Sequence, residues 1–156
     1  MTESTHFRRA ALEDLPVVLR LLEDLHPSDT SVVSLESCEA VWEAICSDDK
    51  IYFGLLEADT ELVASCHLVL VPNLTRDASP YGVIENVVTK KSQRGNGYGT
   101  LLLKSILAVA WDAGCYKVML MTGRKDKKVY DFYKRAGFDM EAKQAFVAHR
   151  IRHGSP

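Results

Sequence analysis

Apolar residues recur three and four positions apart in four stretches of the chain, which is the period of one face of an α-helix. Asp14 stands at the start of the first stretch as a candidate N-cap, and Pro16 falls in its first turn. Gly114 and Gly137 follow the third and fourth stretches, where a glycine commonly ends a helix. Helices are therefore predicted over residues 14–25, 36–47, 100–113 and 126–136.

Shorter apolar and β-branched runs predict the strands. The connection at residues 58–61 is short enough for an antiparallel hairpin between the runs on either side of it. In the last run the apolar residues Phe146 and Val147 would point to opposite faces of a strand. The alternation of apolar and polar residues therefore does not indicate which face is buried. Strands are predicted around Phe7 and over residues 51–57, 62–71, 82–89, 116–121 and 145–152.

The order of these elements is β-α-α-β-β-β-α-β-α-β, with no repeat, linker or break in composition. We therefore expect a single domain over residues 1–156 with an α/β fold built on a mixed sheet. The sheet begins antiparallel and gains a strand–helix–strand crossover after residue 82.

Composition narrows the class of protein. Apolar residues make up 47% and charged residues 26%, which excludes disordered and fibrous chains. The longest apolar run, residues 106–111, is far shorter than the roughly 20 residues that a membrane helix needs. Residues 1–9 show no apolar signal segment, and the four cysteines stand alone with no histidine at zinc-ligand spacing. We expect a cytoplasmic protein without a metal.

The charges are unevenly distributed along the chain. Net charge is −2, yet residues 1–60 hold 13 acidic and four basic side chains, whereas residues 61–156 hold eight and 15. The second half is therefore expected to bind an anion, and the first half to attract a cationic ligand. Nucleic-acid binding by the basic half is a minor alternative, because aromatic residues do not interleave with the basic run.

The chemical signal is a glycine turn over residues 93–100, between a predicted strand and a predicted helix. Gly95, Gly97 and Gly99 would let backbone N–H groups approach a ligand, and a helix N-terminus adds partial positive charge, so the turn suits a pyrophosphate. Tyr98-Gly99-Thr100 lacks the Gly-Lys-Ser/Thr ending of a Walker A loop, and Thr100 replaces the third glycine of a dinucleotide fingerprint. The alternative is a glycine-rich turn with no ligand.

Two linked motifs resemble the GNAT superfamily of acetyl-CoA-dependent N-acetyltransferases. Arg94-x-x-Gly97-x-Gly99 resembles that family's Arg/Gln-x-x-Gly-x-Gly/Ala pattern, and Tyr133-x-x-x-Gly137-Phe138 resembles its late Tyr-x-x-x-Gly-Phe segment. The stretches at residues 84–88 and 114–117 are similar to the glucosamine-phosphate N-acetyltransferase branch.

This resemblance implies the GNAT-like acyl-CoA N-acyltransferase fold, with acetyl-CoA as acyl donor and a small amine as acceptor. From the charge and the apolar pattern, neither nucleic acid nor a membrane is expected as a partner. A homodimer is also consistent with the resemblance. Asp126 stands where the family usually has Asn, and Val129 where it has Ala. The predicted cofactor-binding residues are Val87, Val88, Arg94, Gly95, Asn96, Gly97, Tyr98, Gly99, Thr100, Asp126 and Lys128. Basic residues near them, expected to suit the phosphates of CoA, are Lys90, Lys91, Arg124, Lys125 and Lys127.

Acyl transfer needs a neutral amine, a polarised carbonyl and a thiolate that can leave. Glu85 lies among apolar residues of a strand, where partial desolvation would make it a useful base, although it could equally face solvent. The resemblance assigns Tyr133 to proton donation to the departing sulfur, and Tyr130 replaces it if the register differs; otherwise Tyr133 is a core residue. No cysteine stands in a motif for an acyl-enzyme, so direct transfer in a ternary complex is expected.

The acceptor is expected to be a small cationic amine, because the acidic first half should supply much of its wall. An amino-sugar phosphate is the alternative acceptor, and it would need basic loop residues such as Arg76. A non-catalytic acyl-CoA-sensing module is the alternative function.

Overall fold

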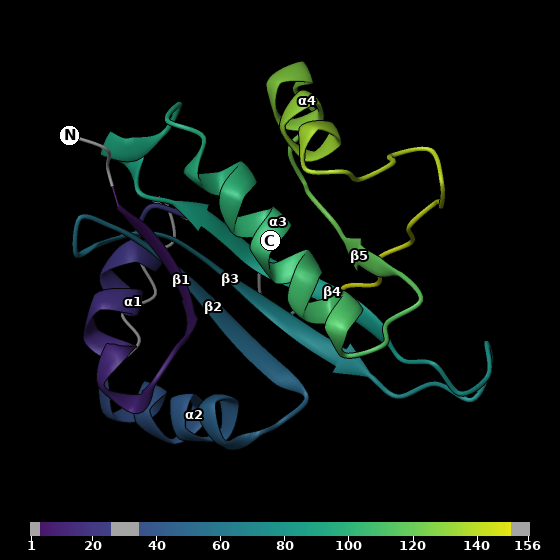
Figure 1. Ribbon diagram of the computed structural model, residues 1–156, viewed down its shortest axis with the longest axis horizontal. Coiled ribbons are helices and arrows are strands. Elements are labelled where there is room, and N and C mark those ends of the chain that lie inside the picture. The colour runs from purple at the N-terminus through teal and green to yellow at the C-terminus, as the bar shows by residue number, and fades with distance from the viewer. Residues whose placement is uncertain (1–3, 26–34, 151–156) are drawn as a thin grey trace, which may run out of the picture.

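The computed structural model describes residues 4–25 and 35–150. A five-stranded sheet forms the middle layer, with α1 and α2 on one face and α3 and α4 on the other (Figure 1). The elements are β1 (Thr5–Arg9), α1 (Leu15–Leu22), α2 (Leu35–Ser47), β2 (Ile51–Ala58), β3 (Glu61–Val71), β4 (Tyr81–Thr89), α3 (Tyr98–Asp112), β5 (Val118–Leu120) and α4 (Lys127–Arg135). Every predicted helix and the first five predicted strands are confirmed, with bounds shifted by a few residues.

The sheet has the order β1-β2-β3-β4-β5. Neighbours pair antiparallel from β1 to β4, and α3 carries the chain across to β5, which pairs parallel to β4. This is the antiparallel start followed by a strand–helix–strand crossover that the sequence predicts. The crossover brings the ends of β4 and β5 together with the start of α3, where the glycine turn lies.

Successive side chains of a strand point to opposite faces of the sheet, so the strands contribute to two apolar cores, one on each face. On one face, Cys66 and Leu68 of β3 are fully buried with Ile106 of α3. On the other face, Phe53 and Trp42 pack edge to face with ring centroids 5.0 Å apart. Apolar burial on both faces stabilises the packing of the helices against the sheet.

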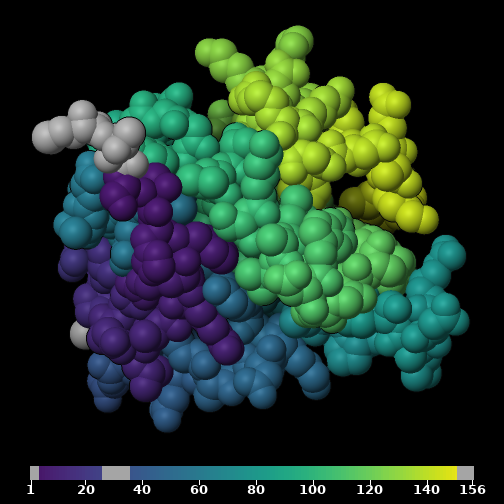
Figure 2. Space-filling model, viewed as in Figure 1, coloured from purple at the N-terminus to yellow at the C-terminus, as the bar shows by residue number. Residues whose placement is uncertain are grey.

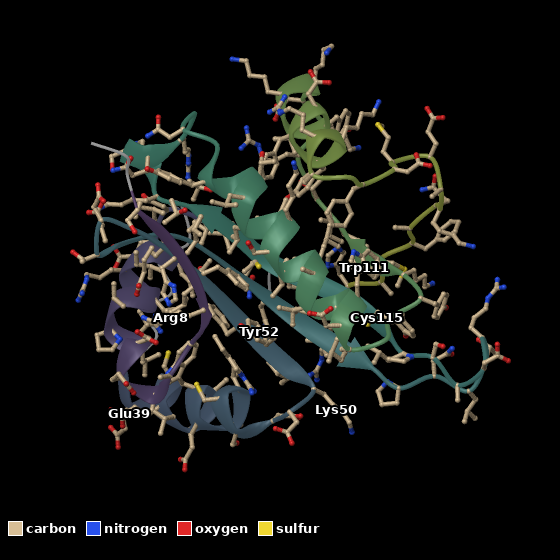
Figure 3. All side chains as sticks on the ribbon, viewed as in Figure 1. Arg8, Glu39, Lys50, Tyr52, Trp111 and Cys115 are labelled. Atoms are coloured by element: carbon tan, nitrogen blue, oxygen red, sulfur yellow. The ribbon has the colours of Figure 1, made fainter. Side chains whose placement is uncertain are left out.

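An ionic cluster fixes the start of α1 to the sheet. Arg8 of β1, labelled in Figure 3, donates to both carboxylate oxygens of Asp14 at 2.7 and 2.8 Å and to Glu57 at 2.7 Å. Asp14 is only 7% exposed and also accepts from the N–H of Ala11 at 2.8 Å. The Arg8 hydrogen bond lowers the pKa of Asp14 against the opposing effect of burial. Asp14 stands at the N-cap of α1, but its side chain serves this cluster and makes no capping bond within α1.

The predicted last strand is wrong for the part that the structure describes. Residues 145–150 form no strand, and residues 151 and 152 lie outside the described range. Phe146 is 92% and Val147 61% exposed, so neither face of this segment is buried and no apolar contact compensates the ordering of a strand. In the space-filling view, the yellow C-terminal segment lies with α4 on the opposite side of α3 from the purple N-terminal segment (Figure 2).

Residues 4–25 and 35–150 contain neither a helix that could cross a membrane nor a cluster of metal-binding side chains. None of the described helices is both long and apolar enough to cross a membrane. Within the same residues, no three histidine, cysteine or acidic side chains gather as a metal site would require.

Candidate active site

The strands β4 and β5 part midway along β4. Their pairing runs from Gly82 opposite Val118 to Ile84 opposite Leu120, whereas β4 continues to Thr89. The last five residues of β4 therefore have backbone groups on that side without a strand partner, and such groups require other hydrogen-bond partners.

A bulge in β4 accompanies this separation. Ser65 lies opposite Val88 and His67 opposite Glu85, so one residue of β3 faces two of β4. Asn86, one of those two, has a left-handed φ of 53°, which asparagine tolerates better than most residues. The extra residue places Glu85 and Val88 on the α1/α2 face of the sheet.

A cavity of about 1170 Å³ opens where the two strands part. Its wall combines the end of α1, the second half of β4, the glycine turn, the end of β5 and one face of α4. All of the predicted site residues line it except Asn96 and Asp126. The structure thus gathers in one cavity residues that lie up to about 50 positions apart in the predicted motifs.

The glycine turn forms the polar end of the cavity. Gly95 and Gly97 have φ values of +94° and +89°, and a Cβ on either would meet nothing within 4 Å. The first hydrogen bond of α3 runs from the N–H of Leu101 to the carbonyl of Gly97, at 3.0 Å. The N–H groups of Gly99 and Thr100, the two residues before Leu101, therefore have no acceptor within the helix, as near any helix N-terminus, and can receive an anion.

Gly99 has a different role from the other two glycines. A Cβ on Gly99 would lie 2.9 Å from Oγ1 of Thr89 and 3.0 Å from the ring of Phe132. Gly99 therefore also permits close packing of α3 against β4 and α4, a role that Gly95 and Gly97 do not share. The approach of its backbone N–H to a ligand stays a prediction.

Basic residues surround the cavity unevenly. Arg94, Arg124 and Lys128 line it as expected, and Arg135 joins them. Two other members of the basic run are engaged elsewhere: Lys90 pairs with Glu61, and Lys127 pairs with Asp131 at 2.6 Å. Lys91 and Lys125 do not line the cavity.

Tyr133 lies on the cavity wall and is half-buried. Its ring is held by Phe132, with centroids 4.8 Å apart, and by Phe138, edge to face at 6.2 Å. Burial raises the pKa of Tyr133 above its ordinary value of 10; the nearby Arg124 opposes this shift and Glu85 adds to it. The hydroxyl is therefore protonated at neutral pH and able to donate a proton. Tyr130 does not line the cavity, so the structure favours Tyr133 of the two.

Glu85 lines the same cavity, but its side chain is exposed. Of the two environments that the sequence left open for this carboxylate, the structure shows the solvent-facing one. Directly opposite on β3, His67 stacks on Phe53 with ring centroids 5.6 Å apart. Burial lowers the pKa of His67 below 6.5, so at pH 7 the imidazole is neutral.

Asn96 and Asp126 serve the local structure. The amide of Asn96 donates to Gln93 within the turn, at 2.9 Å. Asp126 caps α4, because its carboxylate accepts from the N–H of Val129 at 3.1 Å, and it also pairs with Arg124 at 3.1 Å. These contacts explain why neither side chain points into the cavity.

Other residues line the cavity without having been predicted. They include Asp24 and Leu25 after α1, Phe132 and Arg135 of α4, and residues 120–123 at the end of β5. The residues at the end of β5 were predictable as site residues, because binding sites form beyond the carboxyl ends of neighbouring parallel strands. Nothing local in the sequence marks Asp24, whose contacts lie far along the chain.

The acidic first half of the chain contributes little to this cavity. Among residues 4–25 and 35–60, only Asp24 and Leu25 line it. The four cysteines also lie elsewhere, and burial raises the pKa of the Cys66 thiol. In the described residues, the wall therefore offers cations, the carboxylates of Asp24 and Glu85, the phenols of Tyr98 and Tyr133, and no thiol.

The fold and this cavity define an acyl-CoA transferase of the GNAT type, and the comparison with protein families agrees. Residues 18–138 match the family described as "Acetyltransferase (GNAT) family". The chain belongs to this family.

Two relatives are similar over part or most of the chain. A glucosamine 6-phosphate N-acetyltransferase of Trypanosoma brucei brucei is 35% identical over 83 residues, which is 53% of this chain and 54% of that protein. A solved structure of an Agrobacterium tumefaciens str. C58 protein, assigned as an acetyltransferase, is 39% identical and has a TM-score of 0.86, over 93% of this chain and 99% of that one.

The glucosamine-6-phosphate N-acetyltransferase of Arabidopsis thaliana shares the fold, with a TM-score of 0.79 over 95% of this chain and 100% of that one, at 23% identity. The match to the Trypanosoma protein spans about half of that relative's length.

Proposed function

We propose that this protein transfers the acetyl group of acetyl-CoA to a primary amine, and that the amine belongs to an amino-sugar phosphate. One observation carries the proposal: a single cavity joins an anion-binding turn, an open strand edge, a protonated phenol and a carboxylate. Those are the groups that acyl transfer from a CoA thioester requires.

The cofactor has an evident orientation in this cavity. Its diphosphate would lie on the N–H groups of Gly99 and Thr100 at the start of α3, close to Arg94. Its extended amide arm would pair with the unpartnered backbone of β4, which leads the thioester towards Val87 and Val88. The backbone N–H groups there would polarise the thioester carbonyl.

The transfer itself is one addition and one elimination. The lone pair of the neutral amine attacks the thioester carbon, forming the C–N bond and a tetrahedral oxyanion. The nitrogen gives its proton to Glu85 through water, the C–S bond breaks, and Tyr133 protonates the sulfur of the leaving CoA. Direct attack is supported by the position of the four cysteines, none of which lines the cavity.

An amino-sugar phosphate is the favoured acceptor for two reasons. Several relatives are named glucosamine 6-phosphate N-acetyltransferase. The described wall carries Arg94, Arg124, Lys128 and Arg135 against the acids Asp24 and Glu85, and this balance favours an anionic substrate over a cationic one. Arg76, suggested from the sequence for this phosphate, lies over the ring of Tyr116, outside the cavity wall.

The acceptor is tested by measuring release of CoA thiol with four amines: glucosamine 6-phosphate, glucosamine, a polyamine and an aminoglycoside. We expect the highest kcat/KM for glucosamine 6-phosphate and a loss of this preference at high salt, because screening weakens the phosphate contacts. A higher kcat/KM for glucosamine than for its phosphate would refute the acceptor and leave the acetyl transfer intact.

A further inference from the structure

The loop between β4 and α3 is tied to the end of α1 by two hydrogen bonds. The backbone N–H of Lys91 donates to Oδ2 of Asp24 at 2.7 Å. The guanidinium Nη2 of Arg94 donates to the backbone carbonyl of Asp24 at 2.8 Å, while its Nε donates to the carbonyl of Thr89 at 3.1 Å. Asp24, just after α1, thus holds both ends of a segment that lies 67 to 70 positions further along the chain.

Asp24 also lines the cavity beside this turn. A carboxylate near the place where a diphosphate would bind is electrostatically unfavourable for that anion. A direct binding role therefore does not explain an acid at this position, whereas the hydrogen bond to Lys91 does. On its other side the loop is held through Lys90, which pairs with Glu61 and whose N–H donates to the carbonyl of Val63 at 2.8 Å, and through a longer hydrogen bond from Gln93 to Glu61 at 3.4 Å.

We infer that Asp24 is a positioning residue for the diphosphate of CoA, which it serves by fixing the glycine turn in its binding conformation. This inference rests on the proposed function. Glycine loses more conformational freedom on ordering than any other residue, and Gly95 and Gly97 both hold left-handed φ values. A loop that is already ordered in the free protein binds its ligand with a smaller entropy cost.

The test separates the hydrogen bond of Asp24 from its charge. Asp24→Ala removes both, whereas Asp24→Asn keeps an oxygen acceptor and removes the charge. Calorimetric titration with CoA should show roughly five- to tenfold weaker binding to Asp24→Ala. Asp24→Asn should bind as tightly as wild type or more tightly. Glu23→Ala, an exposed acid one position earlier, is the matched control and should leave the affinity unchanged.

A second variant removes the same hydrogen bond from its donor side. Lys91→Pro deletes the N–H at the first residue of a short 3-10 turn, Lys91–Gln93, where proline is tolerated, and it leaves α1 intact. We expect the same loss of CoA affinity as in Asp24→Ala, and no further loss in the double variant, because both changes remove one bond. With acetyl-CoA and an acceptor, the variants should raise the KM for acetyl-CoA and leave kcat unchanged.

Different results would overturn different claims. Wild-type affinity in both Asp24→Ala and Lys91→Pro would overturn the positioning role alone, as would an equal loss in Asp24→Asn and Asp24→Ala. A wild-type chain that does not bind CoA would overturn the proposed function, and the inference with it.

Discussion

Replacing Tyr133 with phenylalanine removes one oxygen from the cavity and little else. The aromatic ring keeps its contacts with Phe132 and Phe138, so we expect the free energy of unfolding to change by less than about 1 kcal/mol. A positioned general acid contributes about 10²- to 10⁴-fold to a rate. Because the cavity is large enough for water to replace the hydroxyl in part, we expect kcat to fall roughly 10- to 1000-fold.

The assay is the steady-state release of CoA thiol at saturating acetyl-CoA, with CoA affinity measured separately. Tyr130→Phe is the matched control, because it makes the same chemical change on the same helix, away from the cavity. The acid form of Tyr133 is lost only as pH rises through a pKa raised above 10, so wild-type kcat should show no alkaline fall from this group below about pH 10. Equal kcat for wild type and Tyr133→Phe would refute the proton-donor role and make this tyrosine a packing residue.

Three further predictions concern the base, the turn and the fold. Glu85→Gln should abolish the acidic limb of the pH profile of kcat/KM, because the amide cannot accept a proton; a retained limb would place the base elsewhere. Gly97→Val should weaken CoA binding, since a β-branched residue at a φ of +89° is strained by about 1–3 kcal/mol; calorimetry showing wild-type affinity would contradict this. Arg8→Met should destabilise the fold at pH 7 by about 2–4 kcal/mol, because Asp14 loses its partner. The pKa of Asp14 is lowered in the folded state, so its stabilisation is present above about pH 4 and is lost as pH falls through the folded pKa. The deficit of Arg8→Met in urea unfolding should therefore shrink in acid; a constant deficit would contradict this explanation.

Local pattern was sufficient for most of the fold. The helices α3 and α4 were predicted because dense apolar stripes coincide with the cores they bury, and glycine follows each. The start of α3 was misplaced by two residues, because the left-handed Gly97 lets the helix begin directly at Tyr98. The prediction of a final strand was wrong because the apolar residues of that segment share no common face that could be buried.

Only those site residues that belong to a local sequence motif could be predicted. The glycine turn and Tyr133 carry local signals, and both reach the cavity. The environment of Glu85 depends on a bulge at Asn86, which no spacing in the sequence reveals. Asp24 was missed because its partners lie about 70 positions away and the interaction exists only in the folded chain. The count of charges along the chain predicted an acidic wall for the acceptor, which the cavity does not have. Acids such as Asp14 and Glu57 instead pair with Arg8, away from the cavity.

The central claim is that this cavity catalyses acetyl transfer to an amine, and product stoichiometry tests it most directly. The protein is incubated with acetyl-CoA and glucosamine 6-phosphate, and mass spectrometry quantifies the N-acetylated sugar phosphate while a thiol reagent quantifies free CoA. We predict equal amounts of amide and CoA, formed over many turnovers and strongly reduced in Tyr133→Phe. Tight binding of CoA without amide product from this or any other amine tested would contradict the account and identify a module that binds acyl-CoA without catalysis.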